Sequence, residues 1–316
     1  MPNRAKDETK GEMKRLVNSL VQSYRDVDGL IRIDGKKHIS PAVVADILGN
    51  LQSVIFAGFF GNIRLQNESI EYYVGNLIEN LLYNLKKQIG RSLQYSAENE
   101  ESIPVRAERI AFDFLSRLPK LREILATDIE SFFDGDPAAF SKDDIILSYP
   151  GIYAIMVSRL AHELYLLGVP LIPRMMTEHA HSLTGIDIHP GATIGRHFFI
   201  DHGTGIVIGE TTVIGNHVKI YQGVTLGALS TRGGQTLKNQ KRHPTIEDNV
   251  TIYSGCSIFG GATVIGEGAV IGSNAFIMKS VPKNTKVSIR NPELQFMHTH
   301  GESVEFDQNE FWDYQI

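Results

Sequence analysis

The chain has 316 residues, 42% of them hydrophobic, and a formal net charge of -5 at pH 7. This length allows two domains with hydrophobic cores, because a domain usually takes about 100–200 residues. The acidic balance, and the lack of any block of Lys or Arg residues, argues against a nucleic-acid partner.

The N-terminal segment, residues 1–14, is charged throughout and lacks the apolar stretch that a secretory signal requires. The longest apolar run, residues 54–60, is far shorter than the ~20 residues that a membrane span needs. We therefore expect a soluble cytoplasmic protein with no membrane partner.

Residues 1–184 are predicted to form an α-helical domain. Ser40 followed by Pro41 resembles an N-cap with proline at the first helical position. Apolar residues then recur at helical spacing along several stretches, and Pro119 is expected to interrupt one of them. Helices are predicted over residues 41–51, 70–85, 110–118, 122–133, 152–167 and 170–183.

From residue 185 the pattern changes to apolar residues that recur every six positions. The repeat comprises Ile188, Ile194 and Ile200, then Ile208, Ile214, Ile220 and Leu226 after a slip of two residues, and finally Ile246, Ile252, Ile258, Val264, Val270 and Phe276, beside a second column of Phe259, Ile265, Ile271 and Ile277. Helical faces recur about every 3.6 residues and strand faces about every 2, so this ladder needs a backbone that turns a corner every hexad.

Such hexads predict a parallel β-helix over residues 185–287, followed by a polar, acidic C-terminal tail over residues 288–316. The predicted fold class is α+β, with a helical domain before the β-helix. The single cysteine, Cys256, lies inside the ladder, which predicts a small core residue rather than a reactive thiol. One cysteine also excludes an internal disulfide and fits a reducing compartment.

The ladder is interrupted at length once, between Leu226 and Ile246. The intervening residues 227–244 are polar and rich in Gly, and they end in Arg242-His243-Pro244. Loops longer than ~12–15 residues in compact domains are commonly functional or disordered. This interruption is therefore a place to look for chemistry.

Two segments of the ladder contain acidic and histidine residues, for which a structural coil has no use. Asp187 and His202 are 15 residues apart. A coil of three hexads has about 18 residues, so we expect these side chains on neighbouring coils, where they could meet if the corners line up. A histidine held by a carboxylate is a competent general base. The alternative is a pair of satisfied polar groups at the edge of a solenoid.

Five polar segments, in chain order, resemble the signature of the serine O-acetyltransferases, which are hexapeptide-repeat acyltransferases. The segments are Asp187-Ile188-His189-Pro190, Ile200-Asp201-His202-Gly203-Thr204-Gly205, Gly209-Glu210-Thr211, Gly223-Val224-Thr225-Leu226-Gly227 and Arg242-His243-Pro244. The likeness is strongest over residues 136–281. It implies a left-handed parallel β-helix, an exception to the usual right-handed crossover rule. The implied reaction transfers the acetyl group of acetyl-CoA to the hydroxyl of L-serine, in cysteine biosynthesis.

The resemblance also implies roles for individual residues. His202 would take the proton from the serine hydroxyl as it attacks the thioester, and Asp187 would orient His202. No bound cofactor and no metal are implied, and acetyl-CoA would be a co-substrate that lies along the outside of the β-helix near Gly227 and Ala228. The sequence departs from the family pattern at Ala228, where a second glycine is common, and at residues 288–292, which replace the usual Gly-x-Pro-Ala.

For the amino-acid substrate, the resemblance implies two sets of opposite charge. Asp136 and Asp201 match the positions that receive the ammonium group, while Arg242 and His243 match those that hold the carboxylate. One cationic and one anionic contact fix the orientation of an amino acid before it reacts. The alternative for Arg242 is a solvated loop face that it shares with neighbouring lysines.

The resemblance implies a homotrimer with active sites between neighbouring β-helices, or a hexamer of two trimers joined through the helical domains. It also implies a partner, because serine acetyltransferases commonly end in an isoleucine that enters the active site of O-acetylserine sulfhydrylase. This chain ends in Ile316. A polar tail that ends in an apolar side chain and a carboxylate suits such capture.

Three other functions fit parts of the pattern. His197 and His202 have the spacing His-x4-His with His189 nearby, as in hexapeptide-repeat carbonic anhydrases that bind zinc, but this leaves Asp136 and Arg242 without a purpose. An acetyltransferase for a sugar or another hydroxyl could use the same base, although the pairing of acidic residues with Arg242 favours an amino acid. The third alternative is a non-catalytic, structural β-helix.

Overall fold

The structure, a computed structural model, describes residues 2–27, 38–60, 70–96, 102–230, 232–238, 240–290, 296–297 and 303–304. Its contacts divide the chain into two compact units, Met1–Ile39 and Ser40–Ile316. The first unit contains α1 (Pro2–Asp26), which the sequence analysis did not predict. Apolar side chains of α1 are exposed at Met13, Leu16, Val17, Leu20, Val21 and Tyr24. The predicted division into residues 1–184, 185–287 and 288–316 stays a prediction.

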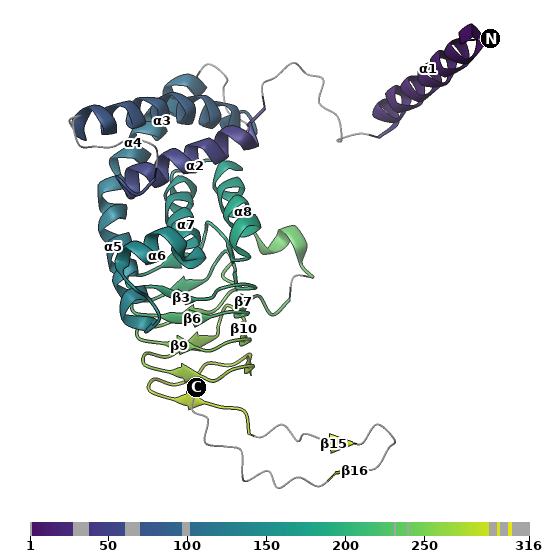
Figure 1. Cartoon of the computed structure of the whole chain (residues 1–316). Helices are drawn as coiled ribbons and strands as arrows, with labels where there is room; N and C mark the ends of the chain where they lie inside the picture. The colour runs from purple at the N-terminus through teal and green to yellow at the C-terminus, as the bar shows by residue number, and fades with distance from the viewer. Residues whose placement is uncertain are drawn as a thin grey trace. The chain divides into compact units, whose positions relative to one another are not determined.

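The second unit begins with a layer of helices (Figure 1). They are α2 (Pro41–Ile55), α3 (Ile70–Leu93), α4 (Ile103–Ser116), α5 (Leu118–Gly135), α6 (Lys142–Ser148), α7 (Pro150–Leu166) and α8 (Ile172–Thr184). The Ser40 hydroxyl accepts a hydrogen bond from the Val43 N–H at 3.4 Å, which confirms the predicted cap of α2. Pro119 lies in the first turn of α5, so it starts a helix there, and α6 was not predicted.

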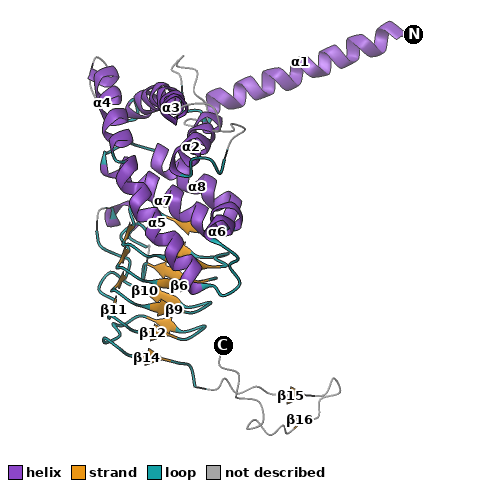
Figure 2. Cartoon of the chain, turned by 60° about the vertical axis from the view of Figure 1, so that its left-hand side comes forward, coloured by secondary structure: helices purple, strands orange, loops and turns teal. Residues whose placement is uncertain are grey.

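The helices lead into a parallel β-helix whose short strands stack into three sheets (Figure 2). The first sheet contains β1 (Asp187–Ile188), β4 (Val207–Ile208), β7 (Thr225–Gly227), β10 (Ser257–Phe259) and β13 (Phe276–Ile277). The second sheet contains β2 (Thr193–Ile194), β5 (Val213–Ile214), β8 (Thr245–Ile246) and β11 (Val264–Ile265). The third sheet contains β3 (Phe199–Asp201), β6 (Lys219–Tyr221), β9 (Thr251–Ile252), β12 (Val270–Ile271) and β14 (Lys286–Val287). This confirms the predicted fold class, a helical region followed by a left-handed parallel β-helix.

The interior of the β-helix is filled by ladder residues. Ile188, Ile208, Leu226 and Ile258 are at most 2% exposed, and Cys256 is fully buried, as predicted. At the far end of the β-helix, the column of inward-facing residues differs from the predicted one. Ile246 pairs with Ile265, so one extra residue lies in that coil and Ile265 takes the inward position in place of Val264. The exposed and half-buried members of the predicted column are Val264, Val270 and Phe276, while Ile265, Ile271 and Ile277 point inward.

The coils are not of equal length. Asp187 pairs with Val207, 20 residues along the chain, whereas Val207 pairs with Thr225, only 18 residues along. The long interruption lies between β7 and β8 and contains a 3-10 turn, Gly234–Leu237. A short antiparallel pair, β15 (Phe296–Met297) and β16 (Ser303–Val304), follows the β-helix, and Ile316 lies outside the described residues.

A buried ion pair fastens the helices to the first coil. Arg159 of α7 donates two hydrogen bonds to Asp128 of α5, at 2.7 and 2.8 Å, and both side chains are buried. Arg159 also donates to the carbonyl oxygens of Ile194 and Gly195, while the Phe198 N–H donates to Asp128. Helices α5 and α7, which both contact β3, are thereby held to the first coil (Figure 1). Among the described helices, none is both long and apolar enough to cross a membrane.

Candidate active site

A pocket of about 450 Å³ lies where the third sheet turns into the first. Its lining comes from this corner, from the end of α5 and from the junction of α6 and α7: Asp136, Ser148, Tyr149, Pro150, Gly151, Ile200, Asp201, His202 and Thr204. These lining residues include two aspartates and neither Lys nor Arg. We refer to Asp136, Tyr149, Asp201 and His202 as the acidic corner.

Asp136 is the residue that ends α5, and both of its carboxylate oxygens accept hydrogen bonds. The Tyr149 hydroxyl donates to Oδ2 at 2.6 Å, and the Ala138 N–H donates to Oδ1 at 2.8 Å. The bond from Tyr149, followed by that from Ala138, lowers the pKa of Asp136. The same bond to Asp136 raises the pKa of Tyr149 to about 12. At neutral pH, Asp136 is therefore a carboxylate and Tyr149 a hydrogen-bond donor.

His202 stands on a sharp turn directly after β3. Its φ of 56° and the φ of 88° at Gly203 both lie in the left-handed region. A Cβ on Gly203 would lie 2.6 Å from Ile186 Cδ1, so only glycine fits there. The His202 side chain is 72% exposed, and its Nε2 lies 3.7 Å from Asp201 Oδ1. The turn thus presents an accessible imidazole beside two carboxylates.

A second cluster lies at the next corner, where the first sheet turns into the second. It consists of Glu210, Thr211, Arg242 and His243, which we call the basic corner. The Thr211 hydroxyl oxygen accepts hydrogen bonds from the N–H groups of Arg242 and His243, at 2.9 and 3.1 Å. Its own proton is therefore directed to His243 Nδ1, 2.9 Å away, which also accepts from the Thr211 N–H at 3.1 Å. These bonds tie the end of the long loop to the second coil.

The charges of the basic corner are paired and largely buried. The Arg242 guanidinium forms an ion pair with Glu210 and donates to the Leu237 carbonyl oxygen at 3.3 Å. Burial opposes ionisation of Glu210, but the bond from Arg242 and the charge of His189 outweigh it and lower its pKa. Burial, followed by the charge of Arg242, lowers the pKa of His243 to about 4. Neutral His243 thus accepts at Nδ1 and carries its proton on Nε2.

Gly209 provides the space that the His243 ring occupies. A Cβ built on Gly209 would overlap Cδ2 and Nε2 of the ring. The φ of Gly209 is not in the left-handed region, so the requirement for glycine here is one of space alone.

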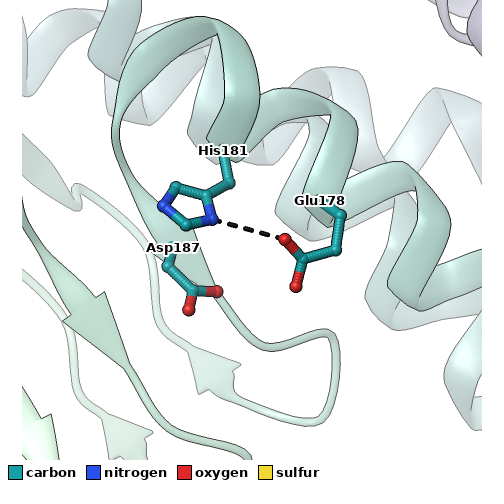
Figure 3. A group of neighbouring side chains, drawn as sticks. All are labelled: Glu178, His181 and Asp187. Atoms are coloured by element: carbon teal, nitrogen blue, oxygen red, sulfur yellow. Dashed lines mark hydrogen bonds and ion pairs between the residues drawn. The ribbon is translucent and has the colours of Figure 1, made fainter.

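Asp187 lies near the basic corner and is surrounded by side chains of α8. Its carboxylate faces Glu178 and His181, whose Nδ1 lies 3.3 Å from a Glu178 oxygen (Figure 3). Arg174 forms ion pairs with Glu178 and with Asp187, at 3.6 Å from its Oδ1. Asp187 and Arg242 also both act electrostatically on the half-buried His189, which places them in one neighbourhood.

The predicted pair of Asp187 and His202 is not in contact within one chain. In the described part of the structure, no hydrogen bond or ion pair joins the two side chains. They lie on the same coil and not on neighbouring coils, because their separation of 15 residues is shorter than one coil, which has 20 residues here. The structure therefore groups Asp136 and Asp201 with His202, Arg242 with His243, and Asp187 with side chains of α8.

Gly227 and Ala228 lie at the start of the long loop, where β7 ends. A Cβ on Gly227 would come within 2.7 Å of Phe259 Cδ1, so the backbone there is packed under an aromatic ring. The histidines of the zinc alternative do not gather within one chain. His197 instead stacks on His217, with ring centroids 4.1 Å apart, and the described residues that come together as potential metal ligands are Glu178, His181 and Asp187.

The sequence analysis assigned no role to three residues that the structure places in these corners. Glu210 and Thr211 belong to the segment Gly209-Glu210-Thr211, which was noted without a function. Their position directly after the ladder residue Ile208, at a corner, was the available signal. Tyr149 carried no signal, because its approach to Asp136 depends on how α5, α6 and α7 fold together.

Known proteins are similar to this chain in both sequence and fold. No family model matches the chain. A serine acetyltransferase of Synechococcus elongatus is 47% identical over 218 residues, which cover 66% of this chain and 68% of that protein. The serine acetyltransferase of Bacillus subtilis is 50% identical over 129 residues, which cover 41% of this chain and 57% of that protein.

The chain belongs to the serine acetyltransferase family. As a serine acetyltransferase it is an acyltransferase enzyme. Solved serine acetyltransferases have the same fold. Serine acetyltransferase 1 of Entamoeba histolytica, in complex with L-cysteine, superposes with a TM-score of 0.69 at 38% identity, over 80% of this chain and 88% of that one. The Neisseria gonorrhoeae serine acetyltransferase, in complex with serine, gives a TM-score of 0.52 at 26% identity, over 77% of this chain and 95% of that one.

Proposed function

We propose that this serine acetyltransferase transfers the acetyl group of acetyl-CoA to the hydroxyl of L-serine, giving O-acetyl-L-serine and CoA for cysteine biosynthesis. The observation that carries this proposal is the presence of two corners, one with two carboxylates and an accessible imidazole, the other with the Arg242 guanidinium. An amino acid presents an ammonium and a carboxylate, and these two corners offer a partner for each.

His202 acts as the general base. Its imidazole takes the proton of the serine hydroxyl while the oxygen attacks the thioester carbonyl of acetyl-CoA. Collapse of the tetrahedral intermediate breaks the carbon–sulfur bond, and the imidazolium returns the proton to the departing CoA sulfur. The 72% exposure of His202 allows it to meet both the hydroxyl and the sulfur.

Asp136 and Asp201 receive the ammonium group of serine. They line the same pocket as His202, and the bond from Tyr149 lowers the pKa of Asp136. Arg242 and the Nε2–H of His243 hold the carboxylate. Because Glu210 pairs with one end of the Arg242 guanidinium, its orientation is set before substrate arrives.

The two corners flank the first sheet, which supports an assembly in which they come from different subunits. If three β-helices turn their first sheets toward a common axis, the acidic corner of one subunit meets the basic corner of the next. Asp187 lies on the first sheet near the basic corner. It would then orient His202 of the neighbouring subunit, which accounts for their separation within one chain.

Acetyl-CoA is a co-substrate in this proposal and no cofactor or metal is bound. The backbone at Gly227 and Ala228 begins the loop that leads to Arg242, so a thioester lying there would approach the serine carboxylate site from outside the β-helix.

Two further proposals concern the partner and the location of the enzyme. The C-terminal tail is captured by O-acetylserine sulfhydrylase through Ile316, and the enzyme is cytoplasmic. The single free, buried Cys256 is compatible with a reducing compartment.

A thiol-release assay tests the substrate. With acetyl-CoA, we expect L-serine to be turned over at least about tenfold more efficiently than L-homoserine or a galactoside. The two charge contacts fix the α-carbon, so the extra methylene of homoserine displaces its hydroxyl from His202, and a galactoside carries neither charge. Equal turnover of the galactoside would favour a sugar acetyltransferase of the same fold and would contradict the roles of Arg242 and Asp136.

Mixed oligomers test the assembly. His202→Ala and Arg242→Ala are each expected to be inactive alone. If each site takes one corner from each of two subunits, random mixing in a trimer restores about a quarter of the wild-type sites. The matched control mixes His202→Ala with Asp136→Asn, which lie in the same corner and should not complement. Absence of recovery in the first mixture, with oligomers formed, would show that both corners act within one subunit.

A further inference from the structure

The aromatic ring of Tyr149 is held in place by the junction of α6 and α7. Tyr149 ends the first of these helices and precedes Pro150, which starts the second. Gly151 packs so closely that a Cβ there would lie 3.0 Å from the Ile200 carbonyl oxygen. The Tyr149 ring meets the edge of Phe132, at 6.1 Å between centroids and 78° between planes. These contacts fix the ring beside the strand that leads into Asp201 and His202.

The hydroxyl of this fixed ring has one described hydrogen-bond partner, the outer oxygen of Asp136. The 2.6 Å bond to Oδ2 and the 2.8 Å bond from Ala138 to Oδ1 leave the carboxylate little freedom to rotate. Asp136 ends a helix and its neighbours Pro137 and Ala138 are exposed, so few other contacts restrain it. Without the hydroxyl, a single backbone bond would remain to orient the carboxylate.

We propose that Tyr149 is a positioning residue for substrate recognition: its hydroxyl aims the Asp136 carboxylate into the pocket, where it receives the ammonium group of the amino-acid substrate. This inference rests on the proposed function, which places the ammonium group at Asp136 and Asp201. Tyr149 acts through Asp136 and takes no part in proton transfer to His202. The high pKa of its hydroxyl, about 12, keeps the donor proton in place across the working range of pH.

Tyr149→Phe tests the proposal in the full-length enzyme, because it removes the hydroxyl and keeps the ring. Loss of a hydrogen bond to a charged group is expected to raise the KM for L-serine about tenfold, with kcat changed less than about twofold. The KM for acetyl-CoA should not change, since no part of that molecule depends on Asp136.

A second ligand separates positioning from a merely structural role. 3-Hydroxypropionate is L-serine without its amino group, so its binding cannot depend on an ammonium contact. We expect Tyr149→Phe to weaken binding of L-serine about tenfold and to leave binding of 3-hydroxypropionate unchanged, with both measured by calorimetry. Equal weakening of both ligands would mean that the pocket had changed shape, and it would overturn the proposal, as would unchanged binding of L-serine.

Tyr221→Phe is the matched control. Tyr221 lies on the third sheet beside Asp201, with its ring 5.0 Å from that of Tyr253, and its hydroxyl makes no hydrogen bond to a described carboxylate. Its loss should leave both ligands unaffected. A wild-type enzyme that does not acetylate L-serine would defeat the proposed function itself. An active wild type, an inactive Asp136→Asn and an unaltered Tyr149→Phe would reject only the role of Tyr149.

Discussion

The acidic and basic corners are built on the same three-sided coil, yet they differ in how firmly their side chains are held. In the acidic corner, His202 stands on a left-handed turn with most of its side chain exposed. In the basic corner, His243 is 8% exposed and Nδ1 of its ring accepts two hydrogen bonds from Thr211. Two histidines of one solenoid thus have opposite environments.

This difference matches what each corner has to do. A general base must exchange a proton with two partners in turn, so it needs access and some freedom to move. A group that recognises a carboxylate needs a fixed position and a fixed protonation state, which burial supplies by lowering the pKa of His243. The comparison therefore predicts that the two histidines respond differently to substitution, to an added methyl group beside the ring and to pH.

The largest effect is expected from His202→Ala. Removal of a general base should lower kcat by about 10²–10⁴-fold, while binding of L-serine, measured by calorimetry, should change little. The exposed position predicts an unchanged unfolding temperature. If kcat stayed at the wild-type value, another group would have to be the base.

A smaller effect is expected from Gly209→Ala, which acts on the basic corner alone. The added methyl group would occupy the space of the His243 ring, so the ring must move and kcat/KM for L-serine should fall about 10–100-fold. Gly49→Ala is the control, because no heavy atom lies within 4 Å of a Cβ built at this position in α2. An active Gly209→Ala enzyme would indicate that the position of His243 is not critical.

The smallest effect concerns stability against pH. The folded pKa of His243 is about 4, whereas the unfolded value is about 6.5. Above pH 6.5 neither state is protonated, so the contribution is fully present there. As the pH falls toward 4, only the unfolded state takes up a proton, and stability should decrease by on the order of 2 kcal/mol. The half-buried His189 contributes with the same sign.

His243→Gln should flatten this decrease when unfolding by urea is followed between pH 7 and pH 4. Gly49→Ala, which leaves His243 in place, is the control and should leave the slope as it was. A slope unaffected by His243→Gln would place the proton uptake elsewhere.

Much of the architecture was predictable because it depends on periodicity. A six-residue repeat specifies the path of the backbone, and it correctly predicted burial of residues such as Ile188, Ile258 and Cys256. It showed the two-residue slip that lengthens the first coil but not the one-residue step in the fourth, because corners absorb extra residues without disturbing the strands. The first coil gained two residues and the fourth gained one, which turned Phe276 outward, to 66% exposure.

The sequence predicted the residue types of the candidate site and two of its groups, Asp136 with Asp201 and Arg242 with His243, but not the separation of Asp187 from His202. Acidic and histidine residues that interrupt an apolar repeat are visible in any sequence, as Asp187 and His202 show. Their partners depend on coil length and on helices that are distant in sequence. Thr211 fixes His243 through a hydroxyl that has no distinctive pattern, and Tyr149 reaches Asp136 only because two helices meet there.

The buried pair of Asp128 and Arg159 has a consequence for how this solenoid can vary. It bonds the helices to the coil that carries His202, so that end of the β-helix cannot be shortened without exposing an unpaired buried charge. The far end, at β14, carries none of the residues in either corner. We therefore expect a change in the number of coils at β14 to disturb the chemistry less than a change at the first coil.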